Sequence, residues 1–283
     1  MRSEHAGVAT EAWLDSFRLM VAAQRELLAR TSGIDARTRY AGVGEGGDRS
    51  LVIDREAEGI VFAELERLHR AGAEFTAISE ERGEVVFGSG SAPERVVIDP
   101  IDGSLNARRT LPSFAFSIAI ASGPAMADVE LGFVHDHGTG EQFLAQRGGG
   151  ATLDGAQLLA RGPGYGLELV GLEAAKPELI LPLVSGLQGK AYRIRAIGSL
   201  ALTICYVAAG RLDGMIGGRP SRSVDVAAAQ LIAREAGASV QFDPFGLTGS
   251  HLDLAARFEI VAALDEELLG TLLGIQRAAN EGR

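Results

Sequence analysis

The chain has 283 residues and 46% of them are hydrophobic, which is enough to bury a core in one large domain or in two that share an interface. Its formal net charge of -10 at pH 7 repels polyphosphate backbones, so we expect no binding to nucleic acid. Cys205 is the only cysteine, which excludes an internal disulfide and any metal site that needs several thiolates.

The N-terminal segment carries acidic residues and a histidine where a signal peptide needs an apolar core. No run of apolar residues approaches the length of a membrane span. These features, together with the single cysteine, predict a cytoplasmic protein that does not associate with membranes.

Two long helices are predicted before the first strand. From Ala12 to Arg30, apolar residues recur every three or four positions, which is typical of an amphipathic helix. A second helix begins at Asp54, whose carboxylate takes a capping position and so has a structural explanation. Between the helices, the glycine-rich segment Gly42 to Gly47 lacks the strand and helix of a nucleotide-binding loop. We expect a mobile loop there, either a plain linker or a lid beside a site.

A series of short β-branched and apolar runs then predicts strands whose connections are too short for crossover helices. These runs are Phe75 to Ser79, Val85 to Phe87, Arg95 to Asp99, Ala115 to Ala121 and Leu131 to His135. They predict a largely antiparallel sheet with two long helices, which is an α+β arrangement.

The sequence HGTGEQFLAQ continues from the last of these runs and predicts a hairpin. His135 and His137 are two positions apart on this strand, so their side chains can face the same side. We expect a surface pair rather than a zinc site, because no third ligand is spaced for it.

After the hairpin, strands and helices alternate, which predicts an α/β arrangement for the second half of the chain. The expected elements are strands at Leu167 to Leu172, Tyr192 to Ala196, Leu212 to Ile216, Ser239 to Phe242 and Phe258 to Ala262, with helices near Pro177 to Leu187, within Gly198 to Gly210, from Val224 and from Asp265. We therefore predict two domains, over residues 1–140 and residues 141–283.

The stretch VVIDPIDGSLN, residues 96–106, places two acids three positions apart. Asp99 follows an apolar β-branched run and is expected at the end of a buried strand. Pro100 disfavours a helical conformation at Asp99, and Gly103 allows a close approach of the backbone. A turn explains these residues as well as a functional site does, because Asp, Pro, Gly and Ser are all common in turns.

Three further acidic positions favour a site. Glu80 follows a predicted strand, Asp54 opens a helix and Asp225 precedes an alanine-rich helix. Each also has a plain explanation, as an exposed turn or a helix cap. Hard divalent cations are held by carboxylate oxygens, and the amides of Gly103 and Ser104 could hold a phosphate. The set therefore predicts metal-assisted hydrolysis of a phosphate ester.

Several segments together carry more information than any one of them, and they are SLVIDREAE, ISEE, VVIDPIDGSLN, IGSLALTICYVAAG and SVDVAAAQLIAREAG. In this order they resemble the inositol monophosphatase family, within the wider group that contains the fructose-1,6-bisphosphatases. The resemblance covers most of the chain. It implies the layered sugar-phosphatase fold and a magnesium-dependent phosphomonoesterase that holds about two to three Mg²⁺ ions per site.

The resemblance also implies which residues bind the metal ions. The ligands would be Glu80, Asp99, the main-chain oxygen of Ile101, Asp102 and Asp225. Asp99 would be shared between the first two ions, and a third ion would lie near Glu80.

The resemblance implies catalytic roles for Asp54, Glu80 and Ser104. Asp54 and Ser104 would polarise and orient the attacking water, with serine standing where the family usually has threonine. The substrate would be bound by Asp102, Gly103, Ser104 and Asp225, with the phosphate held through the amides of Gly103 and Ser104.

The region MIGGRPSRS departs from the inositol-specific members of the family, which carry an acid shortly before the last metal-binding aspartate. Gly217 or Gly218 stands at the matching position, so a polyol would be held less selectively. Arg219 and Arg222 are either contacts for a second phosphate, which would favour a sugar bisphosphate, or solvated surface residues.

The leading hypothesis is hydrolysis of inositol 1-phosphate, or of a related small sugar or polyol phosphate, by direct attack of a metal-activated water. The alternative enzymes are a fructose-1,6-bisphosphatase or a nucleotide 3'-phosphatase of the same superfamily. The alternative without catalysis is a degenerate member that binds metal or phosphate as a regulatory module. The resemblance also implies a homodimer.

Overall fold

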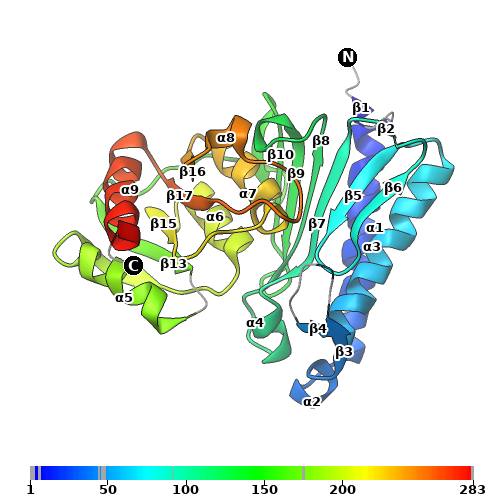
Figure 1. Cartoon of the computed structure of the whole chain (residues 1–283), viewed down its shortest axis with the longest axis horizontal. Coiled ribbons are helices and arrows are strands. Elements are labelled where there is room, and N and C mark those ends of the chain that lie inside the picture. Colours follow the sequence, from blue (N-terminus) through cyan, green and yellow to red (C-terminus); the bar gives the residue numbers. More distant parts are fainter. Residues whose placement is uncertain are drawn as a thin grey trace.

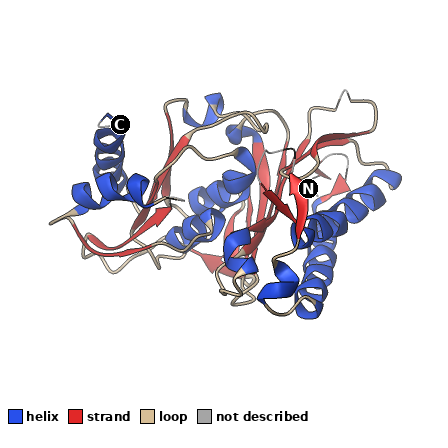
Figure 2. Ribbon diagram, turned by 60° about the horizontal axis from the view of Figure 1, so that its bottom comes forward, coloured by secondary structure: helices blue, strands red, loops and turns tan. Residues whose placement is uncertain are grey.

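The computed structural model describes residues 4–5, 8–43, 45, 49–90, 92–173 and 176–281. Its helices are α1 (Thr10–Arg30), α2 (Ile34–Arg37), α3 (Val52–Arg70), α4 (Ser104–Arg108), the 3-10 helix η1 (Met126–Asp128), α5 (Pro177–Leu187), α6 (Leu200–Ala208), α7 (Ser223–Glu235), α8 (Gly246–Gly249) and α9 (Glu266–Glu281). Helices and sheets alternate in layers: α1 and α3, a larger sheet, α6 and α7, a smaller sheet, then α5 and α9 (Figure 1). Figure 2 shows the same stacking from a second direction.

Eight strands form the larger sheet, and they are β5 (Phe75–Ser79), β6 (Gly83–Phe87), β7 (Arg95–Asp102), β8 (Ala115–Ala121), β9 (Val129–Asp136), β10 (Gln142–Gln146), β11 (Gly150–Leu153) and β12 (Ala156–Leu158). Their order is β12-β11-β10-β9-β8-β7-β5-β6. Neighbours run antiparallel except β5 and β7, which are parallel. This confirms the predicted antiparallel sheet and the hairpin, which joins β9 to β10.

The helices α1 and α3 cover the outer face of the larger sheet with their apolar stripes. Trp13 and Phe17 of α1 are fully buried, and the ring of Trp13 meets that of Phe75 edge-on at 5.7 Å between centroids. Val61 and Leu65, one turn apart on α3, are buried in the same cluster. Each large side chain removed from water in this way stabilises the fold by roughly 1.5–3 kcal/mol.

Five strands form the smaller sheet, and they are β13 (Leu167–Glu173), β14 (Ala191–Arg195), β15 (Gly214–Gly217), β16 (Ser239–Asp243) and β17 (Glu259–Ala263). Their order is β14-β13-β15-β17-β16, with β13 parallel to both neighbours and the other pairs antiparallel. Every strand and helix predicted for this half is present, with its ends shifted by at most two residues. The α+β and α/β prediction is therefore confirmed.

The helices α6 and α7 form the layer between the two sheets. The residues of α7 from Ser223 to Ala233 are all buried, so this helix contacts protein on every side. Its alanines allow a close approach to β9: a Cβ atom added to Gly132 would lie 2.7 Å from the carbonyl oxygen of Ala228. The helix that carries Asp225 is therefore fixed against the larger sheet.

The larger sheet continues past residue 140, because β10, β11 and β12 extend it to Leu158. The smaller sheet begins at Leu167 with β13. Both sheets pack against the same layer of α6 and α7. The division into two domains at residue 140 stays a prediction.

Two other predictions concern segments of which the structure describes only a part. The start of the segment Gly42 to Gly47 belongs to β3 (Tyr40–Val43), which pairs with β4 (Arg49–Leu51). Gly44, Gly46 and Gly47 lie outside the described residues, so the mobile loop stays a prediction. Within the described ranges, no helix is both long and apolar enough to cross a membrane.

Candidate active site

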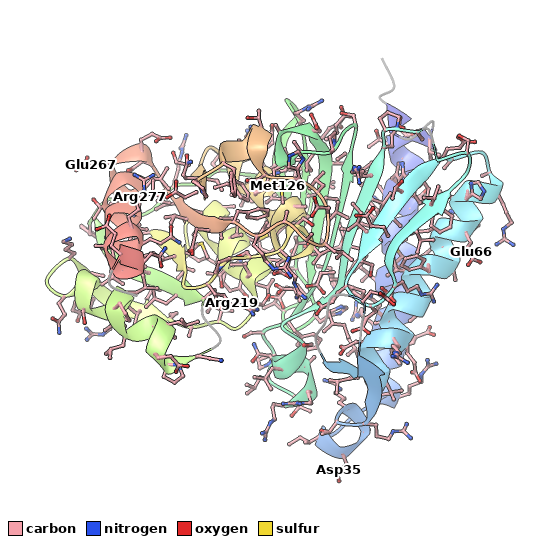
Figure 3. All side chains as sticks on the ribbon, in the orientation of Figure 1. Asp35, Glu66, Met126, Arg219, Glu267 and Arg277 are labelled. Carbon is pink, nitrogen blue, oxygen red and sulfur yellow. The ribbon has the colours of Figure 1, made fainter. Side chains whose placement is uncertain are left out.

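A cavity of about 370 Å³ is lined by residues that lie at the ends of β5, β7 and β13 and in the first turns of α3, α4, α6 and α7. Arg219, labelled in Figure 3, also lines it. The lining includes every residue predicted for the site, namely Asp54, Glu80, Asp99, Ile101, Asp102, Gly103, Ser104 and Asp225. The fold therefore brings these residues together from both halves of the chain.

Asp99 and Asp102 both line the cavity because β7 is irregular between them. In a regular strand, residues three apart point to opposite faces of the sheet. The pairing of β7 with β8 shifts register between these two residues, as in a β-bulge. The carboxylate of Asp99 accepts a hydrogen bond from the N–H of Ile101 at 3.0 Å, which fixes the irregular segment. The predicted end of this strand at Asp99 is wrong, because β7 runs on to Asp102.

Gly103 turns the chain from β7 into α4 with a left-handed conformation, φ 87°. A side chain here would clash, because an added Cβ would lie 2.9 Å from the carbonyl oxygen of Gly198 and 3.0 Å from that of Ser113. Asn106 ties the turn to the same loops by donating hydrogen bonds to the carbonyl oxygens of Ser113, at 2.7 Å, and Ile197, at 2.8 Å. Glycine is therefore required for the turn on which the predicted phosphate amides depend.

Asp102 is held by the N-terminus of α6. The hydroxyl of Ser199 and the N–H of Ala201, at 2.8 Å, donate to its Oδ2 atom, and the N–H of Leu200 donates to its Oδ1 atom at 3.3 Å. Burial raises the pKa of Asp102 to about 7; the hydrogen bond from Ser199 opposes this rise and the charge of Asp225 adds to it. Ser199 was not predicted as a site residue. Its position before an apolar run is a helix-cap signal, but only the folded chain places it beside Asp102.

Asp54 lies in the first turn of α3 rather than at its cap, because the helix begins at Val52. Its Oδ2 atom accepts a hydrogen bond from the N–H of Leu51 at 3.2 Å. Its Oδ1 atom is buried and has no partner among the described residues. Burial raises the pKa of Asp54 to about 7 against the effect of this hydrogen bond, and the charges of Glu81 and Glu80 raise it further. One carboxylate oxygen is therefore available for a ligand or a water.

Arg222 pairs with two of the predicted metal ligands. Its Nη1 and Nη2 atoms donate to the two oxygens of Glu80 at 2.7 and 3.0 Å, and its Nη2 atom also donates to Asp225 at 3.2 Å. Burial lowers the pKa of Arg222, but the negative charges of Asp225 and Glu80 outweigh this effect, so that its pKa is raised overall. The proposal that Arg222 is a solvated surface residue is wrong, since its side chain is only 11% exposed. Asp225 was predicted to precede α7, but it lies in the first turn of that helix.

The remaining acid of the central group, Asp99, is surrounded by like charges. Burial raises the pKa of Asp99 well above its usual value, and the charges of Asp102 and Glu80 raise it further. Buried carboxylates of this kind, together with the unpartnered oxygen of Asp54, fit a hard divalent cation by donor chemistry. In the described part of the chain, however, no three His, Cys, Asp or Glu side chains form a group that could already hold a metal ion.

Glu173 lines the same cavity and was not predicted as a site residue. Its carboxylate accepts hydrogen bonds from the N–H of Ile197 at 2.8 Å and from the hydroxyl of Thr203 at 2.8 Å, and also from the N–H of Gly198. Burial raises its pKa, and these hydrogen bonds oppose the rise. The only signal in the sequence is its position at the end of a predicted strand. Its contacts hold the loop before α6, which in turn positions Asp102.

His135 and His137 are not the surface pair that was predicted. The side chain of His135 is 1% exposed, and the rings of the two histidines meet edge-on at 5.0 Å between centroids. The Nε2 atom of His137 lies 3.2 Å from the side-chain oxygen of Gln24 on α1. The surface prediction is wrong because α1 covers this end of β9, which local sequence does not reveal.

This chain is similar in sequence and in structure to proteins of a known family. A model of the inositol monophosphatase family matches residues 18–281. A fructose-1,6-bisphosphatase/inositol-1-monophosphatase from Methanothermobacter thermautotrophicus is 33% identical over 243 residues, which cover 81% of this chain and 85% of that protein. A Nus factor SuhB from Vibrio cholerae is 36% identical over 197 residues, which cover 66% of this chain and 69% of that protein.

A solved structure gives the same result. The crystal structure of an inositol monophosphatase-fructose 1,6-bisphosphatase gene product superposes with a TM-score of 0.80 at 27% identity, covering 93% of this chain and 99% of that one. These matches define a phosphatase, and hence a hydrolase. The chain belongs to the inositol monophosphatase family.

Proposed function

We propose that the protein is a magnesium-dependent phosphomonoesterase that hydrolyses inositol 1-phosphate or a related small sugar or polyol phosphate by direct attack of water. The observation that carries this proposal is the convergence of acids from separate elements on one cavity, which is also lined by the glycine turn at Gly103 and Ser104. A cavity of about 370 Å³ suits a small phosphorylated polyol.

The magnesium ligands in this proposal are Glu80, Asp99, the main-chain oxygen of Ile101, Asp102 and Asp225. Bound Mg²⁺ would supply two effects, namely a more acidic water and compensation of the negative charge on the leaving oxygen. The raised pKa of Asp99 and Asp102 supports this assignment, because crowded carboxylates are stabilised by a cation placed among them.

The other residues of the chain would position the reactants. The main-chain amides of Gly103 and Ser104 would hold the phosphate at the turn after β7. The unpartnered Oδ1 atom of Asp54 would accept a hydrogen bond from the attacking water, and the hydroxyl of Ser104 would orient it. The network of Ser199 and Asn106 keeps Asp102 and the turn in place.

The test is a phosphate-release assay on a panel of phosphate esters, run after treatment with EDTA and again after Mg²⁺ is restored. We expect release from inositol 1-phosphate only with Mg²⁺. Asp225→Asn is the matched control, because it removes one proposed ligand and keeps the side-chain shape. Equal release with and without Mg²⁺, or an undiminished rate in the variant, would overturn the proposal.

A sugar bisphosphate is the second candidate substrate. The relative from Methanothermobacter thermautotrophicus is named for fructose-1,6-bisphosphatase as well as inositol-1-monophosphatase activity. Arg219 lines the cavity and is exposed, where it would meet a second phosphate. A nucleotide 3'-phosphatase stays a further alternative, and the same panel of esters separates the three.

We also predict that the protein forms a homodimer, that it is located in the cytoplasm and that it does not bind nucleic acid. The non-catalytic alternative is supported by the names of three relatives, one from Vibrio cholerae and two from Escherichia coli, which are each called Nus factor SuhB. If the wild type releases phosphate in the assay above and Asp225→Asn releases less, a purely regulatory module is excluded.

A further inference from the structure

Arg222 joins two acids from opposite halves of the chain. Its guanidinium contacts both oxygens of Glu80, which follows β5, and one oxygen of Asp225 in α7. The three side chains are nearly buried, at 11%, 20% and 11% exposure for Arg222, Glu80 and Asp225. Contacts of this kind, with charged partners and a two-pronged geometry, are the stronger class of hydrogen bond.

A divalent cation would need the same oxygens. Both oxygens of Glu80 already receive hydrogen bonds from Arg222, so a cation on Glu80 would share these oxygens with the guanidinium. Such a cation would also lie against a guanidinium of the same charge in a largely buried setting, where repulsion is strong. We propose that Arg222 is an internal counter-ion that competes with divalent metal for Glu80 and Asp225, so that metal binding requires its side chain to withdraw.

This inference rests on the proposed function, because it takes Glu80 and Asp225 as metal ligands. The arrangement of the acids supports it: no three ligand-type side chains of the described residues are grouped so that they could hold an ion. The acids are instead directed at Arg222, at Ser199 or at main-chain amides.

The movement required is small. The backbone of Arg222 is fixed as the residue before α7, where its N–H donates to the Oδ2 atom of Asp225 at 3.2 Å. Only the side chain has to leave. Arg219, three residues earlier, is already exposed at the same cavity, so a long side chain from this segment can reach solvent.

A purely structural role for Arg222 makes the opposite prediction. If Arg222 only joins the two halves, its removal loosens the site and leaves metal binding unchanged or weaker. If Arg222 competes with the metal, its removal strengthens metal binding while it destabilises the protein kept in EDTA. The two effects are measured separately.

The experiment is calorimetric titration of Mg²⁺, and of Mn²⁺ as a second probe, into the full-length protein after EDTA treatment and dialysis. We expect Arg222→Met to lower the dissociation constant by about tenfold, the effect of losing one competing charged contact. Arg222→Lys keeps the charge but loses the two-pronged geometry, so we expect an intermediate gain. This second variant keeps the test decisive if Arg222→Met does not fold. Thermal unfolding in EDTA should show a lower melting temperature for both variants.

Arg219→Met is the matched control, because it removes one positive charge from the same cavity without touching the Glu80 and Asp225 pair. We expect at most about a threefold change in this control, since an exposed charge is screened by water. An equal gain in Arg219→Met and Arg222→Met, or no gain in Arg222→Met and Arg222→Lys, would overturn the inference alone. No binding of either metal to the wild type or the variants would overturn the proposed function along with it.

Discussion

Asp99 can be neutralised with little change in shape, because asparagine keeps an oxygen that accepts the hydrogen bond from the N–H of Ile101. We expect Asp99→Asn to lower magnesium-dependent phosphate release roughly a thousandfold or more, since a charge central to the site is lost. We also expect an unchanged or higher melting temperature, because the substitution removes repulsion from Asp102 and Glu80. Phosphate release and thermal unfolding of the same preparation check both outcomes. A wild-type rate, or a variant that fails to fold, would contradict the assignment.

His137 offers a prediction that is independent of the metal site. Burial lowers its pKa from 6.5 to about 3, and the charges of His135, Arg25 and Arg37 act in the same direction. The unfolded chain therefore binds a proton at this residue near pH 6.5, whereas the folded protein does not until near pH 3. Its contribution to stability is complete above pH 6.5 and is lost as the pH falls toward the folded value.

The measurement compares His137→Gln with the wild type by chemical denaturation at several pH values. Glutamine keeps a polar group near Gln24 but does not titrate. We expect the wild type to lose about 2 kcal/mol relative to the variant between about pH 8 and about pH 5. A constant difference across this interval would show that the folded protein binds a proton at this histidine over the same pH range as the unfolded chain.

At the level of elements, α7 and β9 pack so closely that their contact tolerates no added atom. A Cβ on Gly132 would lie 2.7 Å from the oxygen and 3.1 Å from the Cα of Ala228, and both belong to backbone that cannot rotate away. We expect Gly132→Ala to lower the free energy of unfolding by about 2 kcal/mol or more. Gly270→Ala on α9 is the control, because nothing lies within 4 Å of its added Cβ, and there alanine should stabilise by up to about 1 kcal/mol. Equal effects in denaturant titrations would contradict the close contact.

The elements themselves follow from short-range patterns, and this explains why so many of them could be predicted. Apolar spacing marks α1 and α3, and β-branched runs mark β5 and β8, all close to their observed ends. The β-bulge in β7 was missed, because it depends on how Asp99 and Asp102 pair with β8. The contact of Arg222 with Glu80 spans 142 positions and no local pattern indicates it.

At the level of the molecule, the two predicted halves are joined by a shared core. One hydrophobic cluster contains Ala119 of the larger sheet, Ala228 of α7 and Met215 of the smaller sheet. The sequence shows that α6 and α7 are apolar, but not that each contacts a sheet on both sides. The acids of the site depend on this layer, because Asp102 is held by the start of α6 and Asp225 lies in α7.

A shared layer predicts that the chain unfolds as one unit rather than as two domains divided near residue 140. Two residues allow a direct test, since Trp13 is the only tryptophan and Cys205 the only cysteine. Trp13 is buried under the larger sheet, whereas Cys205 is buried in the middle layer. We expect tryptophan fluorescence and pulsed thiol labelling to give the same midpoint in urea, because losing the α6 and α7 layer exposes an apolar face of each sheet. Separate midpoints, with Cys205 labelled while Trp13 stays buried, would show that the larger sheet is stable without its inner cover and that the halves are independent domains.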